Sequence, residues 1–159
     1  MLDVIKVATY ICNRYKMQFK MDITEMKLHK LLYFVQRESI IQTGEPMFAE
    51  SFLAWKYGPI VLSVRNYFNE GMLKESISAE DEAKYKSVFD TLFVQLAGKD
   101  AWSLSRLSHG ESSWINARKG LNPDDNGNVP LALEDIRNDA DRIKLHRILV
   151  ETKAIQAAK

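Results

Sequence analysis

The sequence predicts a mainly α protein: a single compact helical domain over residues 1–159, with a small β or extended element near residues 48–56. Three observations predict this fold. Apolar residues recur at helical spacing through most of the chain. Aromatic and polar residues alternate in part over residues 48–55, which is typical of an extended segment. A chain of 159 residues is most simply one domain, and it can bury roughly 70% of its unfolded surface.

The first two helices are expected over residues 2–15 and from about residue 25 to Gly44. Asp22 and Thr24 are the candidate N-caps of the second helix, and Gly44 ends it because glycine accepts a left-handed backbone. The buried stripe of this helix is expected to consist of Leu28, Leu31, Leu32, Val35 and Ile41. Its basic residues are expected on a charged, solvated surface, and so is the histidine between two of them: Lys27, His29, Lys30 and Arg37.

The Gly58-Pro59 pair follows the extended segment. Proline is tolerated in the first turn of a helix, so Pro59 is expected to open a helix that ends at Glu70-Gly71. Trp55 and Tyr57 differ by two positions, so in an extended segment they share one face while Lys56 points the other way. One face would then form core and the other a recognition surface, with a simple packing corner around Gly58-Pro59 as the alternative. The candidate protein-binding residues are therefore Trp55, Lys56, Tyr57, Gly58 and Pro59.

Later helices are expected from Ser78 to near Gly98, from Asp100 to His109, and over residues 113–118. A loop dense in turn residues spans 122–128, and a last helix with a charged outer face follows it. Residues 154–159 are expected to fray.

Charge and composition exclude several classes of partner. The chain has 22 basic and 21 acidic residues, so no overall field favours nucleic acid or a membrane surface. No apolar run approaches the roughly 20 residues that span a bilayer. The N-terminal residues do not have the pattern of a signal peptide. Cys12 is the single cysteine and cannot form an internal disulfide, which fits a cytoplasmic location.

Neither a catalytic set nor a cofactor or metal site is expected. The sequence contains no Gly-x-Ser-x-Gly or His-Glu-x-x-His motif, and its seven glycines are scattered. Residues 122–127 resemble the start of a calcium-binding loop, but the twelfth position is Leu133 where a bidentate Glu is needed. His109 is expected to cap a helix C-terminus with a partly positive ring, and His146 to be solvated. Cys12 lies on an apolar stripe, as a small hydrophobic residue would. Binding is therefore favoured over chemistry.

Several blocks of this sequence resemble the Panacea domain, a SocA-like, phage-associated family. They are Lys27 to Tyr33, Gly44 to Phe48, Ala54 to Val61 and Val64 to Phe68. The family motifs run close to Lys-Leu-x-Lys-Leu-Leu-Tyr, Gly-x-Pro-Leu-Phe and Ala-Trp-x-x-Gly-Pro-Val. A later block, Ser108 to Arg118, and the Asn128 to Leu131 element are also similar, although Ser113 stands where a proline is more usual.

The resemblance implies a mostly helical domain carried by antitoxins of bacterial and phage toxin–antitoxin systems. It implies direct binding of a toxin encoded by an adjacent gene. One alternative is a proteolytic adaptor that delivers a toxin to a Clp-type protease or chaperone, as the SocA-like resemblance suggests. A second is a DNA-binding regulator, but no helix-turn-helix, basic arm or basic excess supports it. An enzyme is the least favoured reading, and the oligomeric state is left open.

Overall fold

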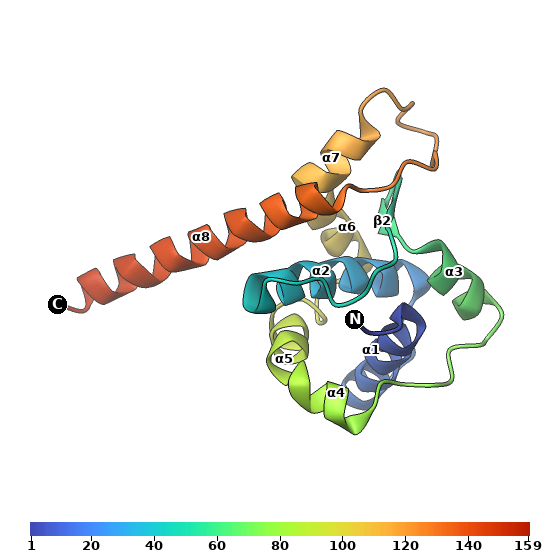
Figure 1. Ribbon diagram of the computed structural model, residues 1–159, viewed down its shortest axis with the longest axis horizontal. Helices are drawn as coiled ribbons and strands as arrows, with labels where there is room; N and C mark the ends of the chain where they lie inside the picture. The colour runs from blue at the N-terminus through green and yellow to red at the C-terminus, as the bar shows by residue number, and fades with distance from the viewer.

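Eight helices and one two-stranded sheet make up the computed structural model, which describes residues 1–159 (Figure 1). The mainly α fold with a small β element is thus confirmed. None of the helices is both long and apolar enough to pass through a bilayer. The elements are α1 (Val4–Phe19), α2 (Glu25–Thr43), β1 (Leu53–Trp55), β2 (Gly58–Ile60), α3 (Leu62–Asn69), α4 (Ala79–Lys84), α5 (Lys86–Gln95), α6 (Ala101–His109), α7 (Ser112–Arg118) and α8 (Leu133–Ala157).

Helix α2 is the centre of the fold. Its caps follow the prediction in part: Thr24 Oγ1 accepts a hydrogen bond from the Lys27 backbone, while Gly44 closes the helix with φ 81°. Helices α1, α5, α6 and α8 and strand β2 all pack around it. Every residue from Lys27 to Ile40 is therefore buried, so the predicted solvated face does not exist.

The buried polar residues of α2 are a correction to the sequence-based expectation. Because neighbours surround the helix, several of its charged side chains find their polar partners within the protein. Lys27 Nζ donates to Tyr15 Oη at 3.0 Å, and Arg37 Nη1 lies 2.7 Å from Glu111 Oε1. His29, expected in solvent, is also buried. Periodicity located the helix, but it does not tell how many sides of it are covered.

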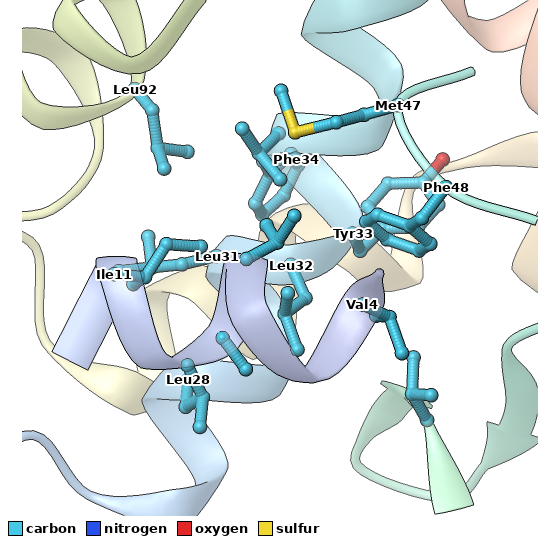
Figure 2. Packing of buried hydrophobic residues seen from close by; sticks show 14 of the residues in the cluster. Val4, Ile11, Leu28, Leu31, Leu32, Tyr33, Phe34, Met47, Phe48 and Leu92 are labelled. Atoms are coloured by element: carbon cyan, nitrogen blue, oxygen red, sulfur yellow. The ribbon is translucent and has the colours of Figure 1, made fainter. Parts of the chain in front are cut away.

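The hydrophobic core lies between α1, α2 and α5 (Figure 2). Ile11 of α1 lies between Leu28 of α2 and Leu92 of α5 in this view, whereas Val4 lies at the other end of α1. Four of the aromatic residues between positions 33 and 68 are fully in the core: Tyr33, Phe34, Phe48 and Phe52. They form edge-to-face and tilted ring pairs, which stabilise the core beyond the area that they bury.

The segment after α2 is tied down by one buried glutamine. Gln36 Oε1 accepts from the backbone of Met47 at 2.7 Å, and Gln36 Nε2 donates to the carbonyl of Phe48 at 2.8 Å. This side chain takes the place of a strand partner for a stretch of backbone that pairs with no strand. Only residues 53–55 of the expected extended element form a strand.

Pro59 does not open a helix, contrary to the prediction. Strands β1 and β2 form a hairpin in which Trp55 is opposite Gly58 and Ala54 is opposite Pro59. The Ala54 backbone N–H points out of the hairpin and donates to Val129 O at 2.8 Å. The Ala54–Pro59 pair therefore needs no hydrogen bond between its members, and the missing N–H of proline costs nothing. Helix α3 begins three residues later, at Leu62.

The C-terminal half follows the predicted order with two differences. The expected helix from Ser78 is interrupted at Tyr85 and forms α4 and α5, although Ser78 Oγ caps it as predicted. Asp100 caps α6, also as predicted. Helix α8 runs to Ala157 and projects away from the rest of the chain (Figure 1). Fraying of residues 154–159 in solution stays a prediction.

Candidate binding site at the hairpin turn

The five predicted binding residues lie in the β1–β2 hairpin. Lys56 and Tyr57 form its two-residue turn between Trp55 and Gly58. Trp55 and Lys56 are half-buried, Tyr57 is exposed, and Gly58 and Pro59 are buried. Trp55 and Tyr57 do not share a strand face as expected, because the strand ends at Trp55 and the alternation of faces ends with it. The turn, and not a strand face, is what this hairpin presents to solvent.

Two hollows flank this turn, and Lys56 and Tyr57 line both. The first, the Lys30 pocket, has a volume of about 310 Å³ and is lined by Glu25, Met26, His29, Lys30, Trp55, Lys56, Tyr57, Gly58, Ile60, Arg65 and Asn126. The second, the Trp102 pocket, measures about 400 Å³ and is lined by Lys56, Tyr57, Trp102, Ser105, Arg106, His109, Pro123 and Asp124. The ring of Tyr57 meets Trp102 edge to face at 5.4 Å, and both side chains are exposed.

Hydrogen bonds from α6 and α7 hold the hairpin in place. Ser105 Oγ donates to the carbonyl of Tyr57 at 2.7 Å. Trp114 Nε1 donates to the carbonyl of Trp55 at 2.9 Å, and Arg118 Nη1 donates to that of Ala54 at 3.0 Å. These donors lie 48 to 64 positions away in the sequence from the residues that they contact, and no local pattern connects them to the hairpin. Sequence reasoning missed them for that reason.

His109 stacks on Trp114, with ring centroids 4.1 Å apart and planes inclined by 15°. It is the last residue of α6, as predicted. Burial and the positive charge of Lys30 lower its pKa, so the expected partly positive ring is wrong. The ring acts here as a neutral, flat packing surface beneath the Trp102 pocket.

Lys30 is the most unusual residue of the site. Only 1% of its surface is exposed, and its ammonium has no hydrogen bond or ion pair with any group of the chain. The single acidic residue of the pocket, Glu25, is engaged with Arg65 Nη1 at 2.5 Å and lies 3.4 Å from His29 Nε2. Burial lowers the pKa of Lys30 to about 8, and the negative charge of Glu25 opposes this shift. The ammonium remains mostly charged near pH 7.

His29 is neutral in this site. Its Nδ1 accepts from the Val61 backbone at 3.3 Å, so the ring proton lies on Nε2. Burial, and then the charges of Lys30 and Arg65, lower the pKa of His29 to about 3. A neutral imidazole thus links α2 to the start of α3.

We expect the free energy of unfolding to fall as the pH drops from about 6.5 to about 3, the interval between the pKa of His29 in the unfolded chain and its pKa in the folded protein. In that interval the unfolded chain binds a proton that the folded chain does not, so acid favours unfolding. Urea titrations at several pH values should show a weaker dependence in His29→Asn, which keeps an acceptor near Val61. His146→Asn is the matched control because His146 is exposed. Equal slopes in all three proteins would contradict the assignment.

The other groups considered from the sequence offer no alternative site. Burial raises the pKa of the Cys12 thiol to about 11, so little reactive thiolate forms at neutral pH. No three His, Cys, Asp or Glu side chains are grouped so that they could hold a metal ion. His146 is exposed, as predicted. The hairpin turn and its two pockets remain the best-defined candidate site.

Comparison with protein families gives one match. The family model described as antitoxin SocA-like, Panacea domain, matches residues 28–115, which is more than half of the chain. The matched range runs from α2 to α7 and contains the hairpin, Lys30 and Trp102. No curated protein and no solved structure matches this chain. The chain therefore belongs to the antitoxin SocA-like Panacea domain family.

Proposed function

We propose that this protein is the antitoxin of a type II toxin–antitoxin system and that it neutralises the toxin of an adjacent gene by direct binding. Family membership supports an antitoxin role. Binding would occur in the cytoplasm, where a toxin made by the same cell acts. The proposed mechanism requires no catalysis, cofactor or metal, because a bound toxin is blocked by occupancy alone.

One observation carries the proposal that a protein is the partner: the projecting end of α8. Every residue from Ile148 to Lys159 is exposed (Figure 1). Successive residues of an α-helix are rotated by about 100° around its axis. At that spacing, four large apolar side chains of α8 lie within an arc of about 120°. They are Leu145, Ile148, Leu149 and Ile155, each between 50% and 58% exposed. An amphipathic helix of this kind is suited to a groove on another protein.

Charge favours a toxin over a second copy of this chain as the occupant. From residue 142 to the end, α8 and its last residues carry five basic and one acidic residue: Arg142, Lys144, Arg147, Lys153, Lys159 and Glu151. Two copies paired along this stretch would place like charges side by side, which is unfavourable. A partner whose groove has an acidic rim is complementary. The hairpin turn, with Lys56, Tyr57 and the neighbouring Trp102, is proposed as a second contact surface.

Co-expression with the neighbouring gene tests the function. We expect the neighbour to be toxic alone, harmless with this protein, and to form a complex that survives size-exclusion chromatography. A non-toxic neighbour that forms no complex would overturn the antitoxin proposal. If toxin levels fall only when a Clp-type protease is present, the adaptor alternative replaces neutralisation by occupancy.

A pair of adjacent substitutions tests the α8 surface. Leu149→Glu places a charge within the apolar arc, whereas Val150→Glu places it about 100° away. The two residues are equally exposed, at 51% and 52%, so both variants should melt like the wild type. We expect only Leu149→Glu to weaken toxin binding, measured by calorimetry. Equal affinities for the two variants would remove this arc from the interface.

A further inference from the structure

We propose that the Lys30 pocket is a binding site for a carboxylate, and that an acidic side chain of the protein partner supplies it. The identification of a protein partner as the source rests on the proposed function, whereas the carboxylate site itself does not. The inference starts from a single fact. A lysine with 1% of its surface exposed has no counter-ion in the chain, although lysines are almost never fully buried unless they are paired.

The protein cannot supply the missing anion itself. Glu25 is the only acidic residue that lines the pocket, and its carboxylate is paired with Arg65 and lies 3.4 Å from His29 Nε2. The lining contains three basic residues, Lys30, Lys56 and Arg65, and His29 is neutral. With Glu25 as the one acid, the pocket has an excess of two positive charges. A buried charge without a partner is costly, so an anion bound from outside is stabilised on arrival.

The pocket is shaped for a small group. Met26, Trp55 and Ile60 supply apolar walls, which lower the local dielectric and strengthen an ion pair at the base. Gly58 allows the hairpin backbone to cover the Lys30 side chain, because any Cβ there would lie 2.6 Å from Lys30 Cε. A volume of about 310 Å³ is near the lower limit of ligand pockets and suits a side chain better than a cofactor.

The donors favour a carboxylate over a phosphate. Phosphates are commonly bound by several donors, including the planar fork of an arginine. Here the guanidinium of Arg65 is already paired with Glu25 and lies over the Trp55 ring at 5.2 Å. The unpaired ammonium of Lys30, with Lys56 also in the lining, matches the negative charge of a carboxylate.

The surroundings of the pocket favour a protein as the source of the carboxylate. Its mouth adjoins the exposed Tyr57–Trp102 pair, and Arg106 lines the neighbouring hollow. Tyrosine, tryptophan and arginine are the residues most enriched among those that dominate binding energy at interfaces. An acidic residue of the partner would enter the pocket while its apolar neighbours pack on the aromatic pair.

Acetate is the probe for the pocket itself. Titration of the free protein should produce saturable NMR shifts of the Trp55 indole N–H and the Gly58 amide. Lys30→Met keeps an unbranched side chain that is one heavy atom shorter and removes the charge, so these shifts should lose saturation while the protein stays folded. Lys74→Met, which removes an exposed lysine outside the pocket, should behave like the wild type. Shifts that stay linear in the wild type would overturn the carboxylate site.

Toxin affinity identifies the source of the carboxylate. We expect Lys30→Met to weaken the complex about 30-fold or more, since an acid of the partner would be left buried and unpaired. Acetate should compete with the toxin for the wild-type protein. Saturable acetate binding with unchanged toxin affinity would overturn the partner as source and assign the pocket to a free carboxylic acid. If no toxin binds even the wild type, the proposed function fails, whereas the acetate result still decides the carboxylate site.

Discussion

Gly58→Val is expected to cause a large loss of stability, because two separate constraints apply at this position. Gly58 has φ 114°, a conformation that residues with a side chain rarely adopt. An added Cβ would also lie 2.6 Å from both Lys30 Cε and Ser108 Oγ. The strain costs about 1–3 kcal/mol, and overpacking adds about 1–3 kcal/mol. Urea unfolding measures the sum.

Gly71→Val is the matched control for this prediction. Gly71 also has a positive φ, 67°, but an added Cβ there would meet no atom within 4 Å. Its variant therefore reports backbone strain without a close contact, and the difference between the two variants reports the contact with Lys30 and Ser108 together with the greater strain of φ 114°. If both variants lose the same stability, the close approach of the hairpin to α2 and α6 does not constrain the fold.

The hairpin shows where sequence reasoning reaches its limit. Gly58-Pro59 is compatible with a helix start and with an edge strand, and the local pattern favours neither strongly. Pairing of Gly58 with Trp55 decides the outcome, together with anchors from Trp114 and Arg118 that lie far away in the sequence. The presence of an extended segment was predictable from its aromatic alternation; its partner and its end were not.

Helix α2 gives the complementary case. Its periodicity and its Thr24 and Gly44 caps made the helix predictable, because these signals are local. The burial of His29 and Lys30 was not predictable, because it depends on elements that approach from the polar side. The candidate site could be placed near residues 55–59, but the lysine at its base came only from the structure.

An acidic side chain whose burial was also not predictable from the sequence holds the junction of α2, α7 and α8. Asp139 has no exposed surface, and nothing in the charged pattern of α8 sets it apart from its neighbours. Its carboxylate accepts hydrogen bonds from the backbone of Ser112 at 2.8 Å, the backbone of Ser113 at 3.0 Å, and Tyr33 Oη at 2.9 Å. It thus satisfies the first turn of α7 and joins it to both long helices.

Glu111 completes this polar cluster. Its Oε2 lies 3.2 Å from Tyr33 Oη, whose single proton is donated to Asp139, and its Oε1 lies 2.7 Å from Arg37 Nη1 and 3.3 Å from Arg142 Nη2. Burial raises the pKa of Glu111, and the two arginines oppose that shift. Every charge in the cluster has a partner, so removing one member leaves the others unsatisfied. We expect this cluster to fix the direction in which α8 leaves the domain.

Asp139→Ala is therefore expected to cost about 3–5 kcal/mol, because two backbone N–H groups and the Tyr33 hydroxyl would lose their acceptor in a buried site. Asp141→Ala is the control: it removes the same group two residues further along α8, where the side chain is exposed and makes no hydrogen bond or ion pair. Urea unfolding should separate the two variants clearly, with the control within about 0.5 kcal/mol of the wild type. Asp139 does not lie on the projecting end of α8. The folded fraction of Asp139→Ala should therefore bind the toxin with an affinity closer to that of the wild type than Leu149→Glu does. An Asp139→Ala protein as stable as Asp141→Ala would show that α7 and α8 stay docked without this carboxylate, and that the orientation of the projecting helix has another origin.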